Sequence, residues 1–422
     1  MTESSEISGF YKLTTEDRLK VLKDFAGLTK EEVQLLRITG ALDLDQANRM
    51  IENVVGTTGF PLGIATNFLI NNRDYLIPMV TEEPSVVAAA SNAAKMARPM
   101  GGFYTESTLP IMIGQIQLIN VENPLRIAEK IKVEKERILA KANEQDPVLV
   151  KLGGGAVGLE VRVIESAVLP MTVVHLLVDV RDAMGANIIN TMCEAVAPLL
   201  EKITGGRAFL RVVSNLAVHR LARVKAVFKK ETLGGEEVVD GILKAYYFAR
   251  SDPYRCATHN KGIMNGVIAV ALATANDTRA LEAGAHAYAA MGGVYKPLSE
   301  WSRTDKGDLM GTLELPMAVG IIGGATAVHP IAKLSRKILK VQSARELGEI
   351  MAATGLANNL AAMKALATEG IQRGHMRLHA RNIAATAGAD GELVDVIAAQ
   401  MIEERKIRVD RAKEILEKWR KS

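Results

Sequence analysis

The sequence predicts an α+β protein: a mainly helical large domain, an inserted domain of order β-α-β-β-α-β, and a small helical region at the C-terminus. Three observations support this prediction. Alanine-rich helical patterns fill most of the chain from residue 216 onward, strands and helices alternate within 110–215, and two helices of mixed charge follow in 391–420. The chain has 422 residues, of which 48% are hydrophobic, enough for two to three domains with a large core.

Short helices are expected in the first sixty residues. Thr29 followed by Glu32 has the form of a capping box, in which each side chain satisfies a backbone amide of the other residue. Further on, Asn71 and Asn72 separate two apolar runs and tolerate positive φ, which predicts a hairpin. An alanine-rich helix over 86–97 should then end near Pro99.

The middle of the chain has an element order that identifies a fold. Apolar runs and amphipathic patterns alternate there in the order of the ferredoxin-like split βαβ arrangement. The expected elements are a strand at 111–119, a helix at 123–143, strands at 159–164 and 171–180, a helix at 186–203 and a strand at 207–213.

After residue 216 the pattern is predominantly helical, with alanine and glycine that let helices approach closely. The expected helices are 236–249, 262–275, 278–290, 331–339 and 344–367, with two more in 391–420.

Composition excludes several classes of protein. Lys+Arg 52 minus Asp+Glu 48 gives a net charge of +4, too balanced for a nucleic-acid-binding surface. Two cysteines cannot build a disulfide framework or a four-thiolate metal site, so reduced thiols and no metal are expected. The N-terminus lacks a signal-peptide pattern, and the apolar stretch 315–332 is interrupted by proline and glycine. A soluble cytoplasmic protein that does not contact membranes is therefore expected.

The one formal dinucleotide fingerprint is rejected. Gly153, Gly155 and Gly158 have the G-x-G-x-x-G spacing, but they precede a strand, whereas the Rossmann mechanism needs them before a helix. A better phosphate site is the segment 182–187 (DAMGAN), which follows an apolar strand and opens a helix. Gly185 there permits close approach of a phosphate to free helix amides, although an ordinary glycine-containing helix start has the same form.

Four polar residues are candidates for carbonyl chemistry: Glu83 at a helix start, Lys261 at the polar opening of the helix 262–275, Asp277 between two helices, and His375. Each residue type at such a place is more often structural, as a helix-terminal acid, a surface charge or a hydrogen-bonded histidine.

Five segments together resemble class II 3-hydroxy-3-methylglutaryl-coenzyme A (HMG-CoA) reductases, in the order and at the separations of that family. They are residues 52–56 (ENVVG), 83–85 (EPS), 182–187 (DAMGAN), 259–262 (HNKG) and 374–376 (GHM). The resemblance runs from about residue 10 to the C-terminus and implies interconversion of HMG-CoA with mevalonate and coenzyme A through two hydride transfers.

The resemblance also implies the catalytic roles. Lys261 stabilises the oxyanion, Asp277 hydrogen-bonds the lysine, Glu83 takes part in proton transfer, and His375 protonates the departing thiolate. The neighbouring His379 is the competitor of His375, and the position directly before Met376 favours His375.

Binding residues follow from the same resemblance. Ser85, Arg255 and Asn265 are expected to contact the HMG portion, with Arg255 suited to its free carboxylate. The inserted domain is expected to bind the dinucleotide. The expected cofactor contacts are Asp182, Met184, Gly185, Asn187, Asn215 and Asp146.

Asp146 is also expected to favour NADH over NADPH, because it lies near the C-terminal end of the first helix of the insert and a carboxylate repels a 2′-phosphate. NADPH is the weaker alternative. A structural role for Asp146 at the helix end before Pro147 was the competing interpretation.

The implied organisation is a large HMG-CoA-binding and dimerisation domain (1–109 and 216–373), an NAD-binding insert (110–215) and a C-terminal flap (374–422). A homodimer with shared active sites is expected, and larger assemblies and the physiological direction stay open. The competing hypotheses are another NAD-dependent oxidoreductase acting on a carboxylate and a non-catalytic coenzyme A or nucleotide binder. The presence of all four catalytic-type side chains argues against the second.

Overall fold

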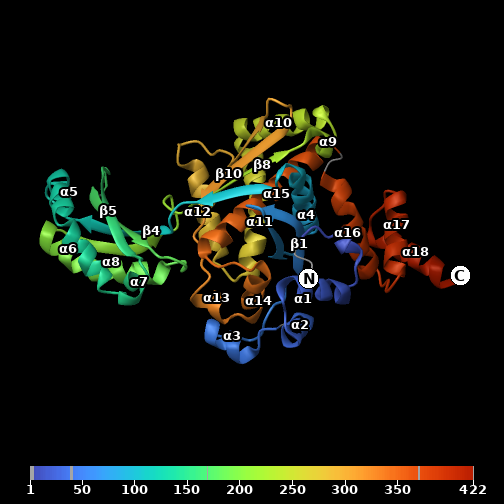
Figure 1. Cartoon of the computed structure of the whole chain (residues 1–422), viewed down its shortest axis with the longest axis horizontal. Coiled ribbons are helices and arrows are strands. Elements are labelled where there is room, and N and C mark those ends of the chain that lie inside the picture. Colours follow the sequence, from blue (N-terminus) through green and yellow to red (C-terminus); the bar gives the residue numbers. More distant parts are fainter. Residues whose placement is uncertain (1–3, 39–40, 169, 369–370, 422) are drawn as a thin grey trace.

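The computed structural model describes residues 4–38, 41–168, 170–368 and 371–421, without the side chains of 371–378 and 421. Figure 1 shows three regions in a row. A four-stranded sheet with its helices lies on the left, a six-stranded sheet surrounded by helices lies in the centre, and the C-terminal helices lie on the right. This is the predicted α+β class.

The central sheet has the order β2-β1-β3-β8-β10-β9. The β1–β2 hairpin turns at Asn71 and Asn72, both at positive φ (48° and 64°), as predicted. The strands β3, β8, β9 and β10 were not predicted, although β10 alternates buried and partly buried side chains with the period of two that marks a strand. The strands are β1 Leu62–Ile70, β2 Arg73–Val80, β3 Phe103–Ser107, β8 Leu221–Phe228, β9 Ser299–Arg303 and β10 Leu309–Pro316.

Helices of the N-terminal region pack as a small cluster against the central region. The predicted capping box is present: Thr29 accepts from the amide of Glu32, and the Glu32 carboxylate accepts from the amide of Thr29. Leu19, Leu22 and Phe25 bury against Leu334 and other apolar side chains. The elements are η1 Phe10–Lys12, α1 Thr15–Ala26, α2 Lys30–Arg37 and α3 Leu44–Met50.

Two long helices run through the core of the central region. In α11 (Pro253–Ala273) and α15 (Ala344–Ala367) glycines allow close packing, since a Cβ on Gly266 would lie 2.5 Å from the carbonyl oxygen of Thr354. The other helices and 3-10 turns of this region are α4 Val86–Ala97, η2 Arg98–Met100, α9 Lys230–Leu233, α10 Glu236–Ser251, α12 Thr278–Ala290, α13 Gly324–Val328 and α14 Pro330–Leu339.

The predicted start of the helix that carries Lys261 was wrong. This helix, α11, begins at Pro253 and not at residue 262, because Asp252 caps it by accepting from the amide of Arg255 (2.7 Å) and proline suits the first helical position. Lys261 is therefore in the interior of the helix and not at its opening.

The four-stranded sheet has the order β5-β6-β4-β7 with every pair antiparallel, which is the ferredoxin-like topology. The predicted helix 123–143 is broken at Glu134, where ψ is 9°, and the short α7 was not predicted. The elements are β4 Ile111–Ile119, α5 Pro124–Val133, α6 Lys135–Asn143, α7 Pro147–Lys151, β5 Gly155–Ile164, β6 Met171–Asp179, α8 Ala186–Thr204 and β7 Arg207–Ser214.

The last three helices bury their own apolar cluster. Ala380 and Ala384 of α16 (Ile371–Thr386) pack with Ile397 of α17 (Leu393–Glu403) and Ile415 of α18 (Val409–Lys421). The two helices expected in 391–420 are present. Among the described residues, no helix combines the length and the hydropathy needed to cross a membrane.

Candidate active site

Glu83 and Lys261 meet although 178 residues separate them in the sequence. Lys261 Nζ lies 2.5 Å from Glu83 Oε2, and Asn265 Nδ2 donates to Glu83 Oε1 at 3.4 Å. Lys261 and Asn265 are one turn apart on α11, so their side chains share a face of the helix. The Lys261 side chain is 56% exposed and that of Glu83 34% exposed, so the pair is open to a ligand from solvent.

Ser85 stands beside this pair in an unusual conformation. It precedes α4 with φ 73°, in the left-handed region that non-glycine residues rarely occupy, and its hydroxyl makes no capping hydrogen bond. Strained backbone of this kind concentrates at functional sites. The turn from Glu83 to α4 therefore presents a carboxylate and a hydroxyl that has no hydrogen-bond partner among the described residues.

A buried polar network holds the turn of α11 directly before Lys261. His259 Nε2 lies 2.7 Å from Ser299 Oγ, and Asn260 donates to the carbonyl of Lys296 (3.0 Å) and accepts from the amide of Leu298 (2.9 Å). Burial, helped by the charge of Arg255, lowers the pKa of His259 to about 3, so this histidine is neutral at physiological pH. No local sequence pattern indicates this support, because the partners lie 36 to 40 residues later in the chain, in the loop before β9 and at its first residue.

Arg255 provides an unpaired positive charge on the same helix. Its guanidinium is half-buried, burial lowers its pKa, and it has no hydrogen-bond partner among the described residues. A guanidinium binds a carboxylate through two parallel hydrogen bonds. Arg255 is therefore suited to an anionic substrate group.

Asp277 lies elsewhere. It caps α12 by accepting from the amides of Arg279 (3.0 Å) and Ala280 (3.1 Å) and forms an ion pair with Arg279. Lys261 is twelve residues before the end of α11, which at 1.5 Å per residue is roughly 18 Å along the helix. Across the described part of this single chain, the predicted hydrogen bond between Asp277 and Lys261 is absent.

His375 falls within α16, and its side chain lies outside the described part of the structure. The competing His379, on the same helix, is exposed. The choice between the two histidines stays a prediction.

The segment 182–187 forms the loop from β6 into α8. Gly185 has φ 100°, and a Cβ there would lie 2.6 Å from Val180, so glycine is required on both counts. The buried Arg220 donates to the carbonyls of Ala183 (3.1 Å) and Met184 (3.2 Å), and burial lowers its pKa to about 10. The loop is thereby fixed with the free amides of a nineteen-residue helix behind it, which fits a dinucleotide phosphate.

The other predicted cofactor residues differ in how far their side chains are engaged. The Asp182 carboxylate accepts from the amide of Ala344 at 2.8 Å, a structural role, whereas Asn187 and Asn215 are exposed. Asp146 does not end a helix, which was the competing interpretation, since α6 ends at Asn143. It caps the start of α7 by accepting from the amide of Leu149 at 2.9 Å, because Pro147 begins a separate helix there.

A second loop packs on the cofactor loop and was missed by the sequence analysis. The amide of Ile321 donates to the carbonyl of Asp182 (2.9 Å), and the amide of Gly320 donates to Asn276 (2.8 Å). Gly323 and Gly324 follow at positive φ with open space where a side chain would be. Gly323 and Gly324 were the sequence signal for this loop, but in the sequence analysis they counted only as interruptions of the apolar stretch 315–332.

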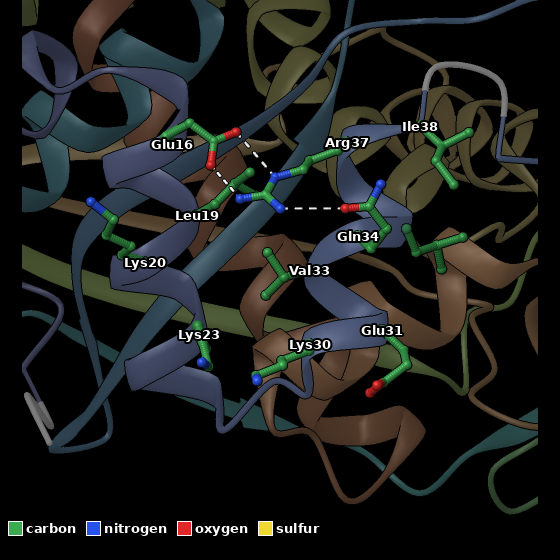
Figure 2. Close-up of a pocket in the computed structure, with 11 residues that line it drawn as sticks. Glu16, Leu19, Lys20, Lys23, Lys30, Glu31, Val33, Gln34, Arg37 and Ile38 are labelled. Carbon is green, nitrogen blue, oxygen red and sulfur yellow. Dashed lines mark hydrogen bonds and ion pairs between the residues drawn. The ribbon is translucent and has the colours of Figure 1, made fainter.

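The cavity between α1 and α2 lies apart from the candidate active site and the cofactor loop. It has a volume of about 660 Å³, and Figure 2 shows Arg37 bonded to Glu16 and Gln34 at its rim, with Leu19 and Val33 in its wall. No predicted catalytic or binding residue lines it.

Both cysteines are free and buried, as predicted. Burial raises the pKa of Cys193 to about 12 and that of Cys256 to about 11, so neither thiol is a ready nucleophile.

The fold and the site define an α+β protein in which a lysine–carboxylate pair in the helical region accompanies a ferredoxin-like domain with a glycine-containing loop before α8. The family model of hydroxymethylglutaryl-coenzyme A reductase matches residues 14–380. The 3-hydroxy-3-methylglutaryl-coenzyme A reductase of Archaeoglobus fulgidus is 61% identical over 417 residues, covering 99% of this chain and 95% of that protein.

Solved structures that resemble this chain belong to the same family. A reductase of the same name from Streptococcus pneumoniae aligns with a TM-score of 0.84 at 40% identity, covering 98% of this chain and 99% of that one. Another structure of the class II enzyme from that organism, bound to NADPH in open conformations, aligns with a TM-score of 0.82 at 40% identity over 97% of this chain and 100% of that one. The chain belongs to the HMG-CoA reductase family.

Proposed function

We propose that the chain interconverts HMG-CoA with mevalonate and coenzyme A, using a nicotinamide cofactor, and that Lys261 and Glu83 form the chemical centre. The observation that supports this most directly is their 2.5 Å contact, with Asn265 on the same carboxylate. A reduced nicotinamide dinucleotide, when bound, would supply one hydride, and two such molecules in succession would supply the two hydrides of the reaction.

Each reduction step builds negative charge on the former carbonyl oxygen of the substrate. Lys261 Nζ, held on a rigid helix, stabilises that charge, and a preorganised cation of this kind is among the strongest contributions to catalysis. Glu83 lies within hydrogen-bond distance of Nζ and exchanges the proton that converts the oxyanion into a hydroxyl. His375 protonates the coenzyme A thiolate as it leaves after the first reduction.

The substrate is held by the groups around this centre. The Arg255 guanidinium, without a partner among the described residues, binds the free carboxylate of the HMG portion. The uncommitted Ser85 hydroxyl and the Asn265 amide contact the remaining polar atoms.

The dinucleotide is bound by the loop 182–187, with Asp182 and Met184 shaping it, Gly185 admitting the backbone approach, and Asn187 and Asn215 exposed beside it. We also propose that NADH is preferred over NADPH, through the Asp146 carboxylate. Capping α7 uses one oxygen of this carboxylate and leaves the other for ribose hydroxyls. Lys151, exposed at the end of α7, weakens the preference by attracting a 2′-phosphate.

Two chains are needed for a complete site in this proposal. Lys261 on α11 meets Glu83 from the turn before α4, whereas Asp277 and the cofactor loop lie beyond the end of α11, linked through Asn276 and Gly320. A homodimer that brings the cofactor loop and Asp277 of one chain to Lys261 of the other would join the two parts. The segment 52–56, which includes the fully exposed Val55, is available for such a contact.

The domain division that accompanies this function is 1–109 with 216–373 for the large domain, 110–215 for the cofactor domain and 374–422 for a flap that brings His375 to the site. The two unpaired cysteines favour a cytoplasmic location.

One spectrophotometric assay tests the function. Nicotinamide absorbance is followed in one run with reduced cofactor and HMG-CoA. A second run contains oxidised cofactor, mevalonate and coenzyme A. Absorbance should fall in the first run and rise in the second, and a purified folded protein that changes neither would refute the proposal.

A further inference from the structure

The glycine run 153–155, rejected as a Rossmann fingerprint, has a different use in the structure. It connects α7 to β5, with Gly153 at φ 80° and Gly155 at φ 107°. A Cβ on Gly153 would lie only 2.9 Å from Nη2 of Arg181. The missing side chain at Gly153 therefore makes room for the guanidinium of Arg181.

The guanidinium of Arg181 contacts the protein through Nε, and its Nη1 and Nη2 face away from that contact. It has φ 52°, its amide donates to Asp179 Oδ1 (3.0 Å), and its Nε lies 3.4 Å from the same buried carboxylate. The side chain is 40% exposed, and in the described ranges of the chain its Nη1 and Nη2 have no hydrogen-bond partner. The ion pair with Asp179 holds the Nε side of the guanidinium without a hydrogen bond to Nε, and Nη1 and Nη2 face outward, available to a ligand.

The position of Arg181 points to an anion. It directly precedes the cofactor loop, where the Asp182 carboxylate is occupied by Ala344 and the carbonyls of Ala183 and Met184 are occupied by Arg220. Among the described residues of this loop, the outer nitrogens of Arg181, the first-turn amides of α8 and the exposed side chain of Asn187 are donors without a side-chain partner.

We propose that Arg181 binds the pyrophosphate of the nicotinamide dinucleotide, and that Gly153 is glycine because a side chain there would displace the guanidinium. This inference rests on the proposed cofactor loop. Since α7 has only five residues, or about 8 Å of helix, Asp146 at its start and Gly153 just past its end lie close together. A dinucleotide that extends from Gly185 to Asp146 passes Arg181 on its way.

Pyrophosphate is common to NADH and NADPH, so Arg181 contributes affinity without discriminating between them. A guanidinium can donate two parallel hydrogen bonds to two phosphate oxygens, whereas a lysine ammonium lacks this planar geometry.

The test is calorimetric titration of the purified Arg181→Gln protein with NADH, NADPH and ADP-ribose, which has the pyrophosphate but no nicotinamide. Loss of a hydrogen bond to a charged group should weaken all three by the same factor, about 10-fold to 100-fold. The KM for HMG-CoA should not change, and Arg181→Lys should be intermediate. Arg162→Gln, an exposed arginine on β5 of the same sheet, is the matched control and should bind normally.

Gly153→Ala tests the link between the two residues. It should weaken NADH binding like Arg181→Gln, and the double variant Gly153→Ala/Arg181→Gln should bind no more weakly than Arg181→Gln alone, because the displaced group is already absent. Thermal unfolding separates this effect from the strain of an alanine at positive φ. The strain should lower the unfolding temperature of both Gly153→Ala and the double variant, whereas NADH affinity should not fall further in the double variant than in Arg181→Gln.

Unchanged dinucleotide affinity in Arg181→Gln, a loss confined to NADPH, or additive losses in the double variant would each overturn the inference. Gly185→Trp distinguishes this failure from failure of the cofactor loop itself. If Gly185→Trp abolishes NADH binding and Arg181→Gln does not weaken it, only the role of Arg181 is wrong. If Gly185→Trp binds NADH normally, the proposed loop is wrong as well.

Discussion

The two functional regions of this chain are built in opposite ways. Around Lys261 the candidate catalytic side chains come from α11 and from the turn before α4, and a buried polar network, His259 with Ser299 and Asn260 with Leu298, supports the helix. Around Gly185 the proposed binding element is the backbone itself, and buried Arg220 fixes the carbonyls of Ala183 and Met184. Substitutions in the first region should therefore change chemistry or substrate binding, whereas substitutions in the second should change cofactor binding only.

The largest effect is expected for Lys261→Ala. Removing one oxyanion-stabilising donor costs a factor of about 10² to 10³ in rate, and the loss of a full positive charge should bring kcat down by at least roughly 10³ in both directions. Affinity for NADH should be unchanged. Steady-state rates and dinucleotide titration check this, with Lys244→Ala, an exposed lysine on α10, as the control. A folded Lys261→Ala protein with near-normal turnover would contradict the mechanism.

His375→Ala should slow thioester reduction by about 10²-fold, a typical contribution of general acid catalysis, and should affect mevaldehyde reduction much less, because only the thioester expels a thiolate. Rates with the two substrates are compared in His375→Ala and His379→Ala. Equal losses with both substrates would remove the leaving-group role, and a selective loss in His379→Ala alone would move the role to that residue.

Arg255→Gln should raise the KM for HMG-CoA by roughly 10-fold to 100-fold, since hydrogen bonds to a charged group are lost. Its effect on kcat and on NADH affinity should be small. Arg255→Lys keeps the charge without the two-pronged geometry and should recover part of the loss. If KM does not change, the guanidinium binds something other than the substrate carboxylate.

The smallest effect is expected for Asp146→Asn, which keeps the size of the side chain and the α7 cap while removing the charge. The ratio of kcat/KM for NADH to kcat/KM for NADPH should fall by up to about 10-fold. The fall should come chiefly from a higher kcat/KM for NADPH, because the charge that repels the 2′-phosphate has been removed. A wild-type preference for NADPH, the cofactor in one Streptococcus pneumoniae structure, or an unchanged ratio would remove Asp146 from the cofactor site.

Local signals predicted the parts of the fold that depend on neighbouring residues. The hairpin at Asn71, the capping box at Thr29 and the strand–helix order of the ferredoxin-like insert were all correct. The strands β3, β8, β9 and β10 were missed, and β3 and β8 in particular are stabilised by pairing across long sequence separations.

The candidate site shows the same division. The motifs named Glu83 and Lys261 separately, but only the folded chain shows that they touch, because the contact depends on β2, α4 and α11 packing together. No local pattern marks the residues that support Lys261, and the glycine spacing at Gly153 does not indicate its contact with Arg181, so both follow from the tertiary structure.

Subunit mixing tests most directly whether the two regions work together across chains. Lys261→Ala and Gly185→Trp chains, each inactive alone, are mixed under conditions that exchange subunits. Random pairing of the two variants restores one intact site in each mixed dimer, so the proposal predicts recovery of about a quarter of wild-type activity. Verified mixed dimers that remain inactive, or a fully active wild-type monomer in sedimentation, would contradict it.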